Sequence, residues 1–120
     1  MATVLTQAGE EFIVDKLDET VATTLPDDVG AGTGAGVAAK ADTTLFTEVT
    51  EARAVATLSQ PAADKLRAVA TQTYTGAKTI TNAGNLTAPT VGTLVVHGDF
   101  AGVAVAANDK IEFTIDLEIT

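Results

Sequence analysis

The chain of 120 residues contains no cysteine and no tryptophan, and only one histidine, His97, and one serine, Ser59. The lack of cysteine excludes disulfide bonds and thiolate metal sites, so stability has to come from packing. Aromatic residues make up only 4% of the sequence, which argues against an aromatic-lined ligand pocket. The sequence therefore contains few of the side chains that commonly act as catalytic nucleophiles or bases.

Positive charge is also scarce. Seven Lys and Arg stand against sixteen Asp and Glu, which gives a formal net charge of −9. Because phosphate groups need a basic surface, we expect no nucleic-acid partner, and an anionic membrane surface would repel the chain. Met1–Leu5 lacks the basic start of a signal peptide, and no apolar run approaches about 20 residues. We therefore expect no membrane partner and synthesis in a cytoplasm.

What the sequence does contain is one strict alternation at its end. The apolar residues Ile111, Phe113, Ile115, Leu117 and Ile119 alternate with polar residues, which is typical of a β-strand with one buried face. We interpret this segment as a strand built into the interior of the fold.

Residues 6–20 show helical spacing, with Thr6 as a possible N-cap and Ile13 and Leu17 four residues apart. The remaining chain alternates short apolar stretches with turn residues. The expected strands are 51–58, 65–75, 78–81, 93–96 and 110–119, and the expected turns or breaks are 26–28, 59–62, 83–85, 98–99 and 108–109.

This pattern predicts one domain over residues 1–120, mainly β, an antiparallel β-sandwich of jelly-roll-like form. Residues 1–30 would supply an N-terminal helix or arm, and residues 31–120 the β core.

Glycine occupies every second position from Gly30 to Gly36. This run excludes a stable helix. It indicates either a flexible loop or an extended segment whose neighbours approach the backbone closely. The fragment Gly34-x-Gly36-x-x-Ala39 fits a loose dinucleotide-binding pattern, but no strand is predicted before it, so a structural role is favoured.

The residues that could carry chemistry each have a plainer interpretation. His97 would need Ser59 and a carboxylate beside it to form a hydrolytic triad, so a half-exposed position at a strand end is favoured. His97-Gly98-Asp99 resembles an adhesion tripeptide that lacks its arginine, and a tight turn explains it better. We expect no catalytic, cofactor-binding or metal-binding residue.

Carboxylates are nevertheless numerous, and Asp27 with Asp28, or Asp99 with Asp109, could in principle hold Ca²⁺. A solvated acidic surface is the favoured interpretation. The candidate carboxylates are Asp15, Asp18, Glu19, Asp27, Asp28, Asp42, Glu48, Glu51, Asp99 and Asp109.

Six stretches, taken in order, resemble a family of small phage virion structural proteins. They contain a Gly-Thr-Gly loop, a Thr-Thr-Leu-Phe-x-Glu segment and a final Asp-x-Ile-x-Phe-Thr strand. Two positions depart from the family pattern: Asn82 stands where Glu is expected, and His97 where Arg is usual. The stretches are 32–36, 40–48, 51–53, 79–84, 94–100 and 108–115.

The resemblance implies a capsid decoration (cement) protein, not an enzyme, that binds the major capsid protein and itself, as a homotrimer, on the capsid exterior of the virion. Tail or fibre components are relatives, so a tail location is the alternative. A small hydrolase using His97 or paired carboxylates is the third hypothesis.

Overall fold

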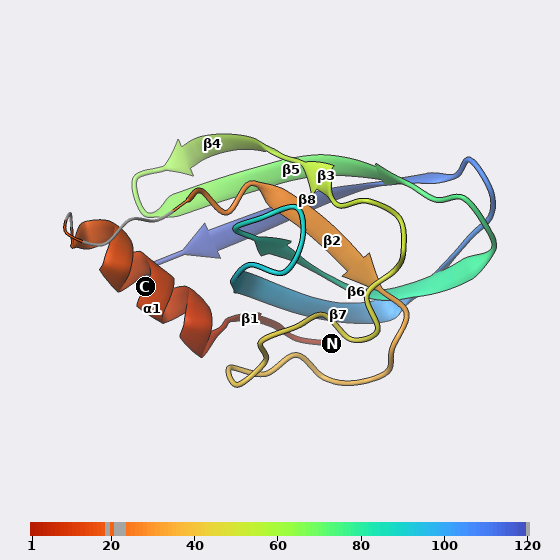
Figure 1. The fold of residues 1–120 in the computed structure, drawn as a ribbon, viewed down its shortest axis with the longest axis horizontal. Helices are drawn as coiled ribbons and strands as arrows, with labels where there is room; N and C mark the ends of the chain where they lie inside the picture. The colour runs from red at the N-terminus through yellow and green to blue at the C-terminus, as the bar shows by residue number, and fades with distance from the viewer. Residues whose placement is uncertain (19, 21–23, 120) are drawn as a thin grey trace.

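A computed structural model describes residues 1–18, 20 and 24–119. In this part of the chain eight strands form two antiparallel sheets, and one helix lies near the N-terminus. The sheets face each other as a sandwich, with the helix at one end (Figure 1). The predicted mainly β fold with one short N-terminal helix is therefore confirmed.

The larger sheet has five strands in the order β1-β7-β6-β2-β3, and the smaller has three in the order β4-β5-β8. The bounds in the larger sheet are Thr3–Leu5 for β1, Leu94–Val105 for β7, Lys78–Leu86 for β6, Asp28–Gly32 for β2 and Ala54–Val55 for β3. Those in the smaller sheet are Thr57–Ala62 for β4, Lys65–Thr73 for β5 and Lys110–Glu118 for β8.

The core lies between the sheets. Its main cluster takes Val29 and Ile80 from the five-stranded sheet and Ala70 and Phe113 from the three-stranded sheet, with the fully buried Tyr74 among them. Small and β-branched residues predominate in this cluster. Buried apolar area of this kind is the main favourable term in folding.

The helix α1 spans Gln7–Leu17 and begins where the sequence predicted. Thr6 is its N-cap, because the Thr6 hydroxyl accepts a hydrogen bond from the Gly9 N–H at 2.9 Å. Phe12 and Ile13 pack against a cluster that includes Val95 and Val96 of β7. β1 pairs with β7, so the residues before the helix are part of the five-stranded sheet.

Three predicted breaks lie inside strands. β4 runs through Ser59–Ala62, β6 runs through Ala83–Asn85, and β7 runs through Gly98–Asp99. β4 tolerates Pro61 because it is an edge strand whose pairing is irregular between Ser59 and Ala62. In β6 and β7, Gly84 and Gly98 continue the strand, and their lack of a side chain allows neighbouring residues to pack closely against the backbone.

β8 confirms the predicted final strand, with Phe113 and Leu117 buried. Its expected interior position was wrong, because β8 is an edge of the three-stranded sheet. Ile119, expected on the buried face, follows the strand and is 53% exposed.

The glycine-rich run is the second of the two predicted forms, an extended segment that neighbours approach closely. Gly30 and Gly32 lie on the same face of β2, opposite the face of Val29 and Ala31. A Cβ on Gly30 would meet the Leu45 side chain at 3.0 Å, and one on Gly32 would collide with the Phe46 carbonyl oxygen. Bare backbone on this face therefore lets residues 45–46 lie directly on the sheet.

We expect Gly32→Ala to destabilise the protein by about 1–3 kcal/mol, because the added methyl group would force the Phe46 backbone away. Gly76→Ala is the matched control, since nothing lies within 4 Å of its added Cβ. Urea unfolding of both variants measures the difference. Equal stability of the two variants would contradict the close packing.

Candidate functional site

Residues 33–53, here called the covering segment, lie over the outer face of the five-stranded sheet. Figure 1 shows this segment passing in front of β6 and β7. The Gly34 N–H donates to the Phe46 carbonyl at 2.9 Å, and the Val49 N–H donates to the Ala31 carbonyl at 3.0 Å. The segment thus folds back along β2, which places its polar side chains above β6 and β7.

His97 lies beneath this segment and is fully buried, so its expected half-exposed position was wrong. Its Nδ1 lies 2.8 Å from Asp42 Oδ2, and its Nε2 lies 3.0 Å from Asn82 Oδ1. The Phe46 ring meets the imidazole edge-on, with ring centroids 4.6 Å apart. The imidazole therefore joins β6, β7 and the covering segment.

The hydrogen bonds fix where the protons lie. Asn82 Oδ1 accepts from the Phe46 N–H at 3.0 Å, and Asn82 Nδ2 donates to the Phe46 carbonyl at 3.1 Å, so the amide orientation is set by the backbone. His97 Nε2 faces an acceptor and must carry a proton. His97 Nδ1 faces the Asp42 carboxylate on its other side. With both nitrogens engaged, the imidazole has no free position for a substrate or metal.

Asp99 holds the covering segment at a second point. Its Oδ1 accepts from the Ala38 N–H at 2.8 Å and from the Ala2 N–H at 2.9 Å. The Ala38 hydrogen bond, together with that from Ala2, lowers the pKa of Asp99 below its usual range against the opposing effect of burial. The carboxylate thus acts as a tie between the N-terminal residues, the covering segment and β7.

A third tie is the ion pair between Arg53 and Glu48. Arg53 Nε lies 2.7 Å from Glu48 Oε2, and Arg53 Nη2 lies 2.8 Å from Glu48 Oε1. Arg53 Nη1 also donates to the carbonyls of Ala88 and Val91, each at 2.8 Å. The guanidinium side chain is 7% exposed and so connects the covering segment to the β6–β7 turn.

Glu51 forms a polar cluster with β5 and β6. It accepts from Lys78 Nζ at 2.7 Å and from the Thr75 N–H at 2.9 Å. These bonds, the one from Lys78 above all, lower the pKa of Glu51 to about 2. Nearby, the Tyr74 hydroxyl donates to Gln72 Oε1 at 2.9 Å, and burial, with the Glu51 charge, raises the pKa of Tyr74 to about 12.

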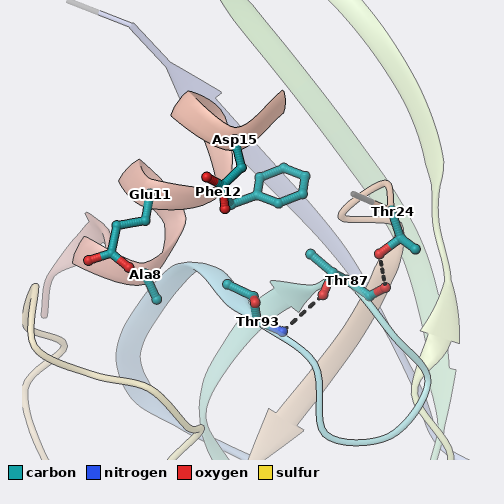
Figure 2. A pocket seen from close by; sticks show the side chains of 7 residues that line it. All are labelled: Ala8, Glu11, Phe12, Asp15, Thr24, Thr87 and Thr93. Carbon is teal, nitrogen blue, oxygen red and sulfur yellow. Dashed lines mark hydrogen bonds between the residues drawn. The ribbon is translucent and has the colours of Figure 1, made fainter. Parts of the chain in front are cut away.

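Figure 2 shows a hollow beside the helix. Ala8, Glu11, Phe12 and Asp15 of α1 face Thr24, Thr87 and Thr93 across about 320 Å³. Two of the threonine hydroxyls are already engaged, since Thr24 Oγ1 donates to the Thr87 carbonyl and Thr87 Oγ1 accepts from the Thr93 N–H. The hollow therefore presents the carboxylates of Glu11 and Asp15 opposite threonine side chains, two of which are bonded to backbone groups.

Two of the residue pairs that the sequence left open, Ser59 with His97 and Asp99 with Asp109, are not brought together. Ser59 is exposed on β4, while His97 is buried in the other sheet. Asp99 binds Ala2 and Ala38, whereas Asp109 accepts from the Ala106 N–H beyond the end of β7, roughly 20 Å of strand away.

Asp27 and Asp28 are the candidate pair that does lie side by side. Asp28 is buried beside Asp27, and its pKa is raised by burial first and then by the Asp27 charge. Among the described residues no group of three or more His, Asp or Glu is placed to hold a metal ion. Glu19 lies outside the described residues.

Sequence reasoning missed the residues that matter most to this face. The contacts of Asn82 and Arg53 were not predicted, because Asn82 meets His97 15 positions away, and Arg53 meets Ala88 and Val91, 35 and 38 positions away. The sequence feature that pointed to this site was the glycine at every second position from Gly30 to Gly36. It indicated an extended segment without side chains on one face, but not which residues pack against that face. Local patterns contain no information about such long-range contacts.

No protein-family model matches the chain, and a search of curated proteins found no match either. Within residues 1–18, 20 and 24–119, no helix has the length and apolar character needed to span a membrane.

We expect His97→Phe and Asp42→Ala each to destabilise the protein by about 2–4 kcal/mol, because Asp42→Ala leaves the buried His97 Nδ1 without a partner and His97→Phe removes a hydrogen bond from both Asp42 and Asn82. The double variant should cost about 1–2 kcal/mol less than the sum of the single variants, since both remove the same contact. A double-mutant cycle by urea unfolding measures this coupling. Strict additivity would show that the two side chains act independently.

We expect the Glu51 ion pair to stabilise the protein at neutral pH and to lose its effect in acid. Unfolded Glu51 binds a proton near pH 4.5, and folded Glu51 only near pH 2, so the stabilisation is complete above about pH 4.5 and declines as the pH falls toward 2. Glu51→Gln should be less stable than wild type by on the order of 1–3 kcal/mol at pH 6, and the gap should shrink by pH 3. A pH-independent gap in urea unfolding would contradict this.

Proposed function

We propose that this chain is a non-enzymatic bacteriophage structural protein, specifically a capsid decoration protein that stabilises the head by binding the major capsid protein. Its location is the capsid exterior of the virion. Cyclic symmetry turns one modest interface into several, so we propose that it acts as a homotrimer.

The observation that carries the proposal is spatial. Five of the six stretches that resemble phage virion proteins contact one another around the covering segment. Phe46 contacts Gly32, Asn82 and His97, while Glu48 pairs with Arg53. Residues that are scattered in the sequence thus form one packed unit, which is expected if they represent a common fold.

The two departures from the family pattern also coincide in space. Asn82 replaces an expected Glu and His97 an expected Arg, and these two side chains are hydrogen-bonded at 3.0 Å. An acid–base pair in relatives would correspond to an amide–imidazole pair here. The family's local contacts at these two positions are therefore not carried over to this chain.

The chemistry of the surface is compatible with this role. A net charge of −9 keeps the free protein soluble and repels packaged DNA. Large apolar side chains are nevertheless exposed and available for contact with protein surfaces. They are Met1, Val14, Leu17, Leu25, Val37, Val55, Val91, Val103 and Ile119.

The test is to locate the chain on the particle of the phage that encodes it. Immunogold labelling of intact virions should mark the head, and particles that lack the protein should lose DNA at a lower temperature until purified protein is added back. Native mass spectrometry should give three times the 12.2 kDa chain mass. Gold on the tail would support the alternative, a tail or fibre component, and unlabelled virions would refute both.

A further inference from the structure

The two sheets differ in width on one side of the sandwich. The five-stranded sheet ends in β7 and β1, whereas the three-stranded sheet ends in β8, which contacts both β6 and β7. A groove of about 190 Å³ lies between β8 and the inner face of the wider sheet. It is lined by Ala83, Val96, Gly98, Phe100 and Thr3 from that sheet, and by Phe113–Asp116 of β8.

Backbone hydrogen bonds show which groups of β8 face this opening. At the two ends of its ladder with β5, the Tyr74 N–H donates to the Asp109 carbonyl and the Ile119 N–H donates to the Asp64 carbonyl. The register between these ends has no shift. Since such pairs alternate along an antiparallel ladder, Phe113 and Ile115 turn their backbone groups toward β5.

Glu112, Thr114 and Asp116 consequently turn their N–H and C=O groups away from β5, toward the open edge. In the described part of the chain no strand pairs with them there. An unpaired edge above an apolar groove has the geometry of a missing strand.

We propose that this edge and groove bind an extended segment of another protein, which is added to the three-stranded sheet as a fourth strand. The proposal specifies how the partner is held, and it depends on the proposed function only for the partner's identity. The backbone of the segment pairs with Glu112–Asp116, and its inward side chains enter the groove.

The lining defines the chemistry of that segment. Phe100 and Phe113 require apolar inward side chains, while Gly98 and Ala83 leave room for branched ones. On the outward face Glu112 is exposed, and the chain as a whole carries −9, so outward Lys or Arg residues are favoured. A second copy of this chain is disfavoured because antiparallel pairing about Thr114 would place Glu112 opposite Asp116, whose carboxylate already pairs with Arg67 and would have to share that partner.

The first test uses a defined probe, a blocked heptapeptide of alternating lysine and valine, with the same peptide N-methylated at alternate residues as control. Hydrogen exchange at the amides of Glu112, Thr114 and Asp116 should slow by about tenfold with the probe and not with the control. Unchanged exchange overturns the proposal. Protection without peptide, together with a doubled mass, would also overturn it in favour of a second copy.

The second test measures binding to particles that lack the protein. Thr114→Pro removes one outward N–H without breaking the ladder to β5 and should weaken binding about tenfold, whereas Thr114→Val retains the N–H and should bind like wild type. Equal binding by both variants overturns the proposal. If Thr114→Pro fails to melt cooperatively, exchange at the same three amides of particle-bound wild type decides instead. If the wild-type protein binds no particle, the proposed function is refuted. The peptide experiment then still tests whether the edge of β8 binds an extended segment.

Discussion

Bare backbone on the outer face of β2 is the constraint on which the rest of this structure depends. Because Gly30 and Gly32 carry no side chains, Leu45 and the backbone of Phe46 lie directly on the strand. That contact is what allows the covering segment to bury His97, Asn82 and Arg53 instead of leaving them in water. A single methyl group at this face would displace the segment and expose a polar interior that depends on it.

The buried polar groups specify this arrangement more than they stabilise it. Burying charged or hydrogen-bonding side chains costs desolvation, and only a fully satisfied network offsets that cost. Here the satisfaction is complete among the described residues, where no buried side-chain nitrogen or oxygen lacks a partner. A shifted covering segment would leave His97 facing apolar atoms, so the network penalises alternative registers.

Elements with local signals could be predicted, whereas those defined by distant contacts could not. The alternation in β8 and the Thr6 cap are local, and both were found in the structure. Gly84 and Gly98 were predicted to lie in turns. The local sequence does not distinguish a glycine that ends a strand from one that lies inside a strand and allows another segment to pack closely against it. The Cβ of a residue at position 84 would meet the Val96 carbonyl, a partner twelve positions away. His97 was misplaced for the same reason, since its environment comes from the covering segment.

The difference in sheet width follows from how the glycines are used. The covering segment closes the outer face of the five-stranded sheet, so that sheet can be wide without exposing its polar network. The inner face near Gly98 and Phe100 has only the edge of β8 beside it, and in the described chain no further strand completes the smaller sheet. A free-standing soluble protein generally protects such an edge, whereas a component that assembles gains from leaving it open. The proposed fourth strand would cover this edge in the same way that the covering segment covers the outer face of the wider sheet.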